Sequence, residues 1–138
     1  MNRQVFIDTG AFLALANTGD QYHLSAKNCI QELRSTNAIL ITTNFILDET
    51  YTRIQRKAGS KTAVEFGESV QSSRQIKIIS VDRSLEKKAW DIFKKYGDHS
   101  FSYTDCTSFA LMKQKKIPRA FAFDKDFKIF GFELIPNS

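Results

Sequence analysis

Residues 4–12 read QVFIDTGAF, and this stretch decides the fold. Gln4 to Ile7 is short and apolar, as a buried strand is, and Asp8 ends the apolar run. A helix that carries Phe12 is then predicted to begin near Gly10. The stretch therefore predicts a strand that turns directly into a helix, with an acid at the turn.

The same alternation of strands and helices continues along the chain. Further strands are predicted at residues 38–41, 76–81, 121–123 and 132–135. Further helices are predicted at residues 22–34, 44–59, 61–72, 85–96 and 104–115, and Asn44 is expected to cap the second of these. Short apolar strands that alternate with helices indicate an α/β fold, in which a parallel sheet is covered on both faces and the crossovers are right-handed.

The composition indicates a single domain over residues 1–138. Hydrophobic residues make up 42% of the chain and include 12 Phe, which is ample for one buried core. Cys29 and Cys106 are too few and too far apart to suggest a disulfide framework. No stretch approaches the roughly 20 apolar residues that span a bilayer. We therefore expect a reduced, cytoplasmic protein that does not enter membranes.

The formal net charge is +5. If four acids are sequestered in one cleft, the rest of the surface carries +9, and such a surface favours polyanions. The basic residues gather in two main groups, Lys113, Lys115, Lys116 and Arg119, and Arg53, Arg56 and Lys57. For each group, an ordinary solvated helix face remains the alternative.

Four isolated acids lie where apolar stretches end or helices begin: Asp8, Glu49, Asp105 and Asp124. Asp8 ends the first strand and Asp124 ends the fourth. Ligands of parallel sheets bind beyond the carboxyl ends of the strands, so these two acids open into one crevice if their strands are neighbours. Helix capping is the alternative for both, and Asp126 can replace or support Asp124.

The other two acids lie within helices. Asp105 follows Ser102 by three residues, which matches a capping box, but helical spacing also places it on the face of Phe109 and Met112. A charge on an apolar face needs a partner or a cation. Glu49 has a surface pair with Arg53 as its alternative, and helical phase does not choose between it and the adjacent Asp48.

Four short motifs around these acids resemble those of the PIN domain family, the small nuclease fold that includes the VapC toxins of bacterial toxin-antitoxin pairs. The motifs are VFIDTGAF at 5–12, NFILDET at 44–50, SYTDC at 102–106, and AFDKDF at 122–127 followed by Gly131 and Phe132. The second motif selects Glu49 over Asp48. Ala122 departs from the hydroxyl residue that relatives often carry, and Asp126 occupies a position often held by His or Asn. The resemblance spans nearly the whole chain.

The resemblance implies a three-layer α/β/α sandwich with a five-stranded parallel sheet in the order 3-2-1-4-5. The first and fourth strands would then be neighbours. It also implies that Thr9, Ser102 or Thr104 holds a carboxylate or bridges to metal through water.

Convergence of the four acids would require a cation. Two carboxylates about 5 Å apart repel each other by about 3 kcal/mol at an effective dielectric near 20. Mg²⁺ or Mn²⁺ relieves that repulsion and keeps water available for reaction, whereas His23 and His99 show no spacing typical of a zinc site. The acids predict metal-dependent phosphodiester hydrolysis by Asp8, Glu49, Asp105 and Asp124 that leaves a 5′-phosphate, and the resemblance implies that the substrate is RNA, which makes the chain a ribonuclease.

The predicted partners follow from this function. Lys113, Lys115, Lys116 and Arg119 would hold RNA phosphates, while aromatic residues such as Tyr22 and Tyr103 either stack on bases or belong to the core. A toxin would be blocked by a small antitoxin protein, and the resemblance implies a homodimer. The alternatives are a non-catalytic PIN-like RNA-binding or scaffold module, an RNA-processing nuclease that is not a toxin, and a receiver-like protein with Asp8 as nucleophile.

Overall fold

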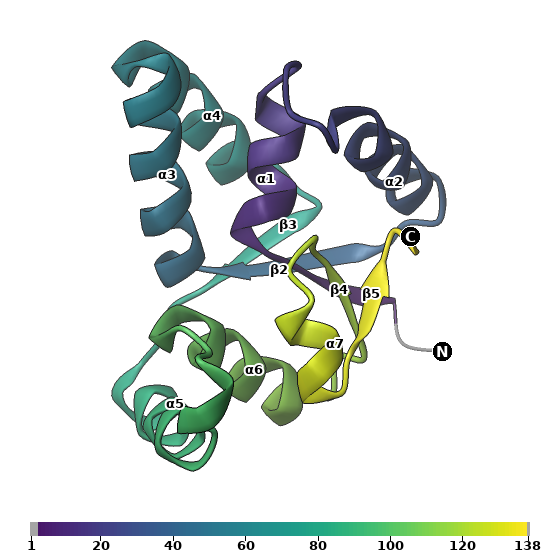
Figure 1. The fold of residues 1–138 in the computed structure, drawn as a ribbon. Helices are drawn as coiled ribbons and strands as arrows, with labels where there is room; N and C mark the ends of the chain where they lie inside the picture. Colours follow the sequence, from purple (N-terminus) through teal and green to yellow (C-terminus); the bar gives the residue numbers. More distant parts are fainter. Residues whose placement is uncertain (1–2, 138) are drawn as a thin grey trace.

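A parallel five-stranded sheet runs through the middle of the molecule, with helices on both faces (Figure 1). The computed structural model describes residues 3–137. Over these residues the strands are β1 (Gln4–Ile7), β2 (Ile39–Thr43), β3 (Ile76–Ile79), β4 (Arg119–Phe121) and β5 (Glu133–Ile135). The helices are α1 (Thr9–Ala16), α2 (His23–Ser35), α3 (Asn44–Ala58), α4 (Ser60–Ser72), α5 (Arg83–Lys95), α6 (Tyr103–Lys115) and α7 (Asp126–Phe130), with a short 3-10 turn, η1, at Gly97–His99.

The strand order is β3-β2-β1-β4-β5, and every pairing is parallel, as predicted. β1 is the central strand, because Phe6 is in register with Ile41 of β2 on one side and Ala120 of β4 on the other. The carboxyl ends of β1 and β4 therefore lie side by side at one edge of the sheet.

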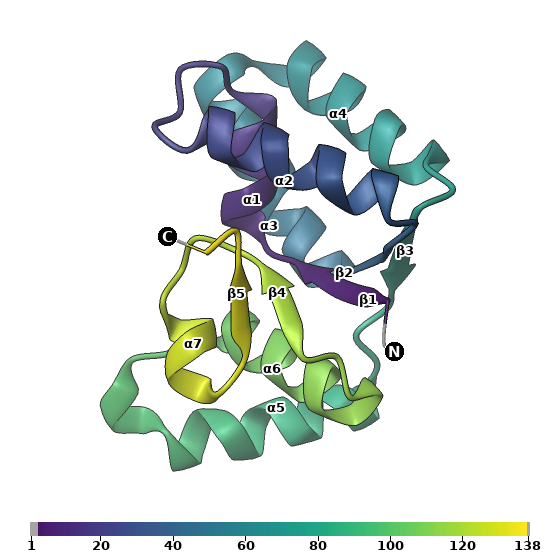
Figure 2. The ribbon, with the colours of Figure 1, turned by 90° about the vertical axis from the view of Figure 1, so that its right-hand side faces the viewer.

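The helices form a layer on each side of the sheet (Figure 2). α1 to α4 cover one face and α5 to α7 cover the other. Val5, Phe6 and Ile7 are fully buried because both faces of β1 are covered. α6 lies between the sheet and α5, and every residue from 105 to 112 is buried. This full burial explains why α6 has no clear polar face.

The cap of α3 differs from the prediction. Thr43, rather than Asn44, is the N-cap, and its hydroxyl accepts a hydrogen bond from the Ile46 N–H at 3.1 Å. Asn44 is already in the helix, and its Oδ1 accepts from the Val81 N–H at 2.7 Å. Thr and Asn can both cap a helix. Here Thr43 is the cap, and Asn44 instead bonds the backbone of Val81.

The fourth strand also differs from the prediction. It spans Arg119–Phe121 rather than residues 121–123, because its pairing with β1 ends where Ile7 meets Phe121. The apolar run continues beyond the last paired residue and hid this end. Asp124 therefore lies three residues past the strand instead of at its end. The third strand ends early as well, at Ile79 rather than at residue 81.

Two short elements were not predicted. α7 has five residues and η1 has three, so both are too short for a clear helical pattern in the sequence. Cys29 and Cys106 are free and buried, in agreement with the prediction of no disulfide framework. Within residues 3–137, no helix is both long and apolar enough to cross a bilayer.

Candidate metal centre

The predicted acids approach one another at the edge of the sheet where β1 and β4 end. One oxygen from each of Asp105, Asp124 and Asp126 lies within 4.8 Å of the others. The charges of Asp105, Asp124 and Glu49 each help to raise the pKa of Asp8. Asp126, expected only as a support or replacement for Asp124, is thus part of the cluster itself.

Asp8 lies at the turn between β1 and α1 and is only 6% exposed. It occupies the N-cap position of α1, but its side chain makes no capping hydrogen bond. Burial, together with the charges of Asp105, Asp124 and Glu49, raises the pKa of Asp8 from 3.8 to about 8, against the opposing effect of the Thr9 N–H. Capping therefore does not explain this carboxylate.

Asp105 enters the cluster from the first turn of α6 and is 9% exposed. Its N–H donates to the Ser102 hydroxyl at 3.0 Å, so the predicted capping by Ser102 is present. Burial, followed by the charge of Asp124, raises the pKa of Asp105 to about 6, while hydrogen bonds from Ser102 oppose that rise. Asp105 is thus both part of a helix cap and part of a repulsive cluster.

Asp124 lies in the loop that joins β4 to α7, and Asp126 is the first residue of α7. Oδ1 of Asp124 accepts a hydrogen bond from the Asp126 N–H at 2.9 Å, which fixes the turn between them. Burial and the charge of Asp124 raise the pKa of Asp126, and His99 lowers it. The loop and the start of α7 therefore present two carboxylates to Asp105.

Glu49 lies in the first half of α3, bonded to Thr9 but outside the group formed by Asp105, Asp124 and Asp126. Its Oε1 accepts a hydrogen bond from the Thr9 hydroxyl at 3.1 Å, and its Oε2 lies 4.0 Å from Nη1 of Arg53. The side chains of the Arg53 pair are 57% and 44% exposed, so this predicted surface pair contributes little to stability. The bond from Thr9 links Glu49 to the residue that follows Asp8, and no such bond involves Asp48 in the described part of the chain.

A cavity of about 470 Å³ adjoins Glu49. Its lining includes Phe45, Thr104, Arg53 and Arg56. Thr104 therefore lies near Glu49, and its support of a carboxylate or a metal, which the resemblance implies, stays a prediction. Asp48 and Glu49 line the same cavity, so its charged side chains carry no net charge together, and the two arginines are the groups there that can bind a phosphate.

The other basic group lies farther away. Lys113 and Lys115 are in the last turn of α6, whereas Asp105 is in the first turn. At 1.5 Å per residue, eight to ten residues of helix separate them by roughly 12–15 Å. Lys116 is the C-cap of α6. Arg119 begins β4, so it lies at the amino end of that strand, whereas the acids lie beyond the carboxyl ends of β1 and β4.

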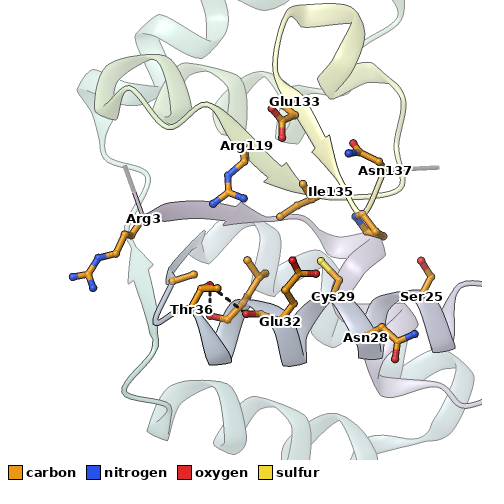
Figure 3. A pocket seen from close by; sticks show the side chains of 13 residues that line it. Arg3, Ser25, Asn28, Cys29, Glu32, Thr36, Arg119, Glu133, Ile135 and Asn137 are labelled. Carbon is orange, nitrogen blue, oxygen red and sulfur yellow. Dashed lines mark hydrogen bonds between the residues drawn. The ribbon is translucent and has the colours of Figure 1, made fainter. Parts of the chain in front are cut away.

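Arg119 lines a separate cavity of about 640 Å³ (Figure 3). This cavity lies between α2 and the β4–β5 side of the sheet, and Cys29 and Glu32 line it from α2. Its charged side chains, Arg3, Glu32, Arg119 and Glu133, carry no net charge together. None of the predicted acids lines it, so it is not the metal centre.

The donor set fits a hard divalent cation. Among the described residues, Asp105, Asp124 and Asp126 form the one group of His, Cys, Asp or Glu side chains close enough together to share an ion. All of its donors are carboxylate oxygens, which suit Mg²⁺ and Mn²⁺. Burial first, and the neighbouring carboxylates second, raise the pKa values of Asp8 and Asp105, and a bound cation would offset both effects.

Comparisons with known proteins agree with this geometry. The model of the PIN domain family matches residues 5–133. The 23S rRNA-specific endonuclease VapC20 of Mycobacterium tuberculosis is 35% identical over 128 residues, which cover 93% of this chain and 95% of that protein. A VapC ribonuclease of Archaeoglobus fulgidus is 31% identical over 125 residues, 89% of this chain and 78% of that one.

Solved structures show the same fold. The crystal structure of VapC20, described as a Sarcin-Ricin loop cleaving toxin, superposes with a TM-score of 0.85 at 34% identity and covers 93% of this chain and 95% of that chain. A chain in the crystal structure of VapBC2 from Rickettsia felis has a TM-score of 0.72 and covers 95% of this chain and 96% of that one. At 12% identity, the second likeness concerns the fold alone.

Proposed function

The chain belongs to the PIN domain family, and from that premise we propose that it is a divalent-metal-dependent ribonuclease, acting as a VapC-like toxin. The observation that carries the proposal is the convergence of Asp105, Asp124 and Asp126 beside the buried Asp8. Grouped carboxylates raise one another's pKa values, and such groups are characteristic of catalytic and metal-binding sites.

The metal ligands in this proposal are Asp8, Glu49, Asp105 and Asp124, with Asp126 in support. Mg²⁺ or Mn²⁺ bound there supplies a Lewis acid for hydrolysis of a phosphodiester bond and lowers the pKa of water. The reaction adds water at phosphorus and breaks the bond to the 3′ oxygen, so one product carries a 5′-phosphate and the other a 3′-hydroxyl.

Side chains around the acids keep them in place. The Thr9 hydroxyl orients Glu49, and the Ser102 hydroxyl accepts the Asp105 N–H at the start of α6. Thr104 lines the adjoining cavity, where it can hydrogen-bond to substrate. Arg53 and Arg56 in the same cavity can bind an RNA phosphate as it approaches the acids.

RNA that extends beyond this cavity would meet further positive charge. We assign Lys113, Lys115, Lys116 and Arg119 to sequence-independent phosphate contacts with distant parts of the substrate. The relatives named as VapC ribonucleases support RNA as the substrate class. The basic residues that we assign to RNA binding then form two groups. Arg53 and Arg56 line the cavity beside Glu49, and the group from Lys113 to Arg119 lies farther away.

Two protein partners belong to the proposal. An antitoxin would block the acids by inserting an Arg or Lys among them, since a cation there replaces the metal charge. A homodimer would form through the first helices and the α3–α4 hairpin. We place this activity in the cytoplasm, where both cysteines stay reduced.

RNA cleavage by the purified protein in the presence of Mn²⁺ tests the assignment. We expect Asp105→Asn to lose cleavage, and Asp98→Asn to retain it because Asp98 is exposed outside the cluster. Chelation with EDTA should abolish cleavage by the parent. Full cleavage by Asp105→Asn, or cleavage that survives EDTA, would sink the proposal, and a folded parent that binds RNA without cleaving it would favour a non-catalytic module.

A further inference from the structure

We propose that the outer face of α5 binds unpaired nucleotides of the RNA substrate beside the acid cluster. This inference rests on the proposed ribonuclease function and adds a binding surface to it. The surface, which we call the α5 face, consists of Arg83, Lys87, Trp90, Phe93 and Lys94.

The α5 face exposes two large aromatic side chains. Trp90 is 51% exposed and Phe93 is 39% exposed, whereas Leu85 and Ala89 of the same helix are buried. The centroids of the Trp90 and Phe93 rings lie 5.6 Å apart. α5 is the outermost helix on its side of the sheet, beyond α6 (Figure 2), and both rings stay partly exposed although Tyr103 packs against them. An exposed aromatic cluster of this kind is typical of a binding surface rather than of a core.

The exposed rings connect inward to the start of α6. The Tyr103 ring meets Trp90 at 6.3 Å and Phe93 at 5.8 Å, both nearly edge-on. The Tyr103 hydroxyl lies 3.3 Å from the Glu86 carbonyl oxygen, to which it donates, so Tyr103 is fixed against α5. Tyr103 and Asp105 both lie in the first turn of α6, so the aromatic cluster starts on the helical turn that carries this acid.

The same series of rings reaches the cavity beside Glu49. Phe45 lies 6.5 Å from Tyr103, centroid to centroid, and lines that cavity together with Glu49 and Arg53. A strand of RNA whose phosphate lies in the cavity would therefore meet Phe45 and Tyr103 first and the α5 face next. The surface offers successive rings for successive bases.

Positive charge accompanies the exposed Trp90. Arg83, Lys87, Trp90 and Lys94 follow one another at steps of four, three and four residues, which places them on one side of the helix. Nζ of Lys94 lies 3.9 Å from Oδ1 of Asp91, but both side chains are more than 60% exposed, so the pair is weak. In the described part of the chain, neither Arg83 nor Lys87 forms an ion pair. These cations remain available for phosphate.

This combination favours single-stranded RNA as the occupant. Stacking of an unpaired base on an aromatic ring strengthens binding by about tenfold per base and is tolerant of sequence, while neighbouring cations hold the backbone. A second copy of this basic chain would bring like charges together on the α5 face. Paired bases in a duplex offer no free ring face, so duplex RNA should bind this surface less well.

The protein carries a built-in reporter for the test, because Trp90 is its single tryptophan. The probe is a short single-stranded RNA of mixed sequence, added in EDTA so that it is not cleaved, and the same RNA annealed to its complement. Trp90 fluorescence reports stacking, and anisotropy of a labelled RNA reports affinity. The variants are Trp90→Leu, Trp90→Phe and Lys87→Glu, with Leu24→Ala as control because Leu24 is also apolar and exposed but lies on α2.

We expect the single strand to quench Trp90 fluorescence saturably and the duplex to quench it weakly. Trp90→Leu should bind the single strand about tenfold more weakly, Trp90→Phe should retain most of the affinity, and Leu24→Ala should match the parent. Lys87→Glu should weaken binding and reduce the dependence of log affinity on log salt by about one. Unchanged fluorescence on binding, together with unchanged affinity of Trp90→Leu and Lys87→Glu, would overturn the inference.

Cleavage in Mn²⁺ separates this inference from the proposed function. If Trp90→Leu cleaves RNA with the parent's kcat/KM, the α5 face is wrong and the nuclease assignment stands. If RNA quenches Trp90 in a parent that cleaves nothing, the α5 face stands and the nuclease assignment fails. If Trp90→Leu changes the sedimenting mass but not the RNA affinity, α5 is a contact between copies and the inference is overturned.

Discussion

The Thr9 hydroxyl donates a hydrogen bond to Oε1 of Glu49 at 3.1 Å across a sequence separation of forty residues. The Thr50 hydroxyl lies 3.2 Å from the Thr9 oxygen and completes a small buried network between α1 and α3. Thr9 directly follows Asp8. The network therefore links Glu49, the most exposed candidate ligand, to Asp8, the most buried one.

Removal of the Thr9 hydroxyl should therefore impair activity more than stability. Thr9→Val keeps the shape of the side chain but frees Glu49, and loss of such an outer contact typically lowers metal affinity or activity about 10- to 100-fold. Stability should fall by only about 1 kcal/mol per lost hydrogen bond. Cleavage rates over a Mn²⁺ titration measure the effect. Thr9→Ser, which keeps the hydroxyl, should stay near the parent, and equal defects in both variants would contradict the role of the hydrogen bond.

Divalent metal should stabilise the folded protein. A ligand that binds only the native state at 100 times its Kd raises the free energy of unfolding by about 2.7 kcal/mol. We expect Mn²⁺ to raise the Tm of the parent and of Asp98→Asn, but to raise that of Asp105→Asn much less. Scanning calorimetry on the three proteins provides the measurement. A flat response of the parent up to millimolar Mn²⁺ would argue against a metal centre that forms without RNA.

Stability without metal should fall as the pH rises. Burial and neighbouring charges raise the pKa of Asp8 from 3.8 to about 8 in the folded state, so between these values the folded protein binds more protons than the unfolded chain. This carboxyl therefore contributes stability below about pH 4 that is lost as the pH rises towards 8. Asp105, with a pKa of about 6, acts in the same direction over a narrower window.

The variant Asp8→Asn tests this dependence. An amide cannot ionise, so the metal-free variant should be more stable than the parent at pH 7 and at pH 8. At pH 7 its free energy of unfolding should exceed that of the parent by about 4 kcal/mol at most. Urea unfolding in EDTA at pH 5 and pH 8 gives the comparison. A parent that is equally stable at both pH values relative to Asp8→Asn would show that Asp8 is ionised without cost.

The two basic groups should differ in their effect on RNA affinity. Arg56 lines the cavity beside Glu49, so Arg56→Glu should weaken RNA binding about tenfold for any sequence. The double reversal of Lys115 and Lys116 should weaken binding of longer RNA broadly, because these residues lie at the far end of α6. Anisotropy with RNAs of two lengths measures both effects. Unchanged affinity of the double variant for the longer RNA would exclude the far surface.

Much of this fold could be predicted from short-range pattern. The apolar run before Asp8 and the helices around Leu33 and Leu47 were visible because burial imposes a period on them. The end of β4 was not visible, because Ala122 and Phe123 are as apolar as the paired residues and only the pairing with β1 sets the limit. α7 was missed because five residues leave no period to detect.

The sequence predicted Asp8, Glu49, Asp105 and Asp124 as the site, whereas the carboxylates that lie closest together in the structure are those of Asp105, Asp124 and Asp126. Motif resemblance chose Glu49 over Asp48, a choice that helical phase could not make and that agrees with the hydrogen bond from Thr9. Asp126 was expected to support or replace Asp124, and its carboxylate lies with those of Asp105 and Asp124. The local turn closed by the bond from the Asp126 N–H to Asp124 Oδ1 helps to set that position. Trp90 gave no signal in the sequence, because Tyr103, which packs against it, comes from another helix.

The burial of α6 has a consequence for genetic screens. Asp105 sits on a helix whose residues are buried from 105 to 112, so the helix cannot repack without moving that carboxylate. Substitutions at Phe109 or Met112, which are fully buried, should therefore abolish toxicity in a growth-rescue selection even though neither is a candidate metal ligand. Surviving cells would therefore carry substitutions in the interior of the α5–α7 layer as well as at the acids. The yield of soluble protein would distinguish variants that fail to fold from folded variants that lack an acid.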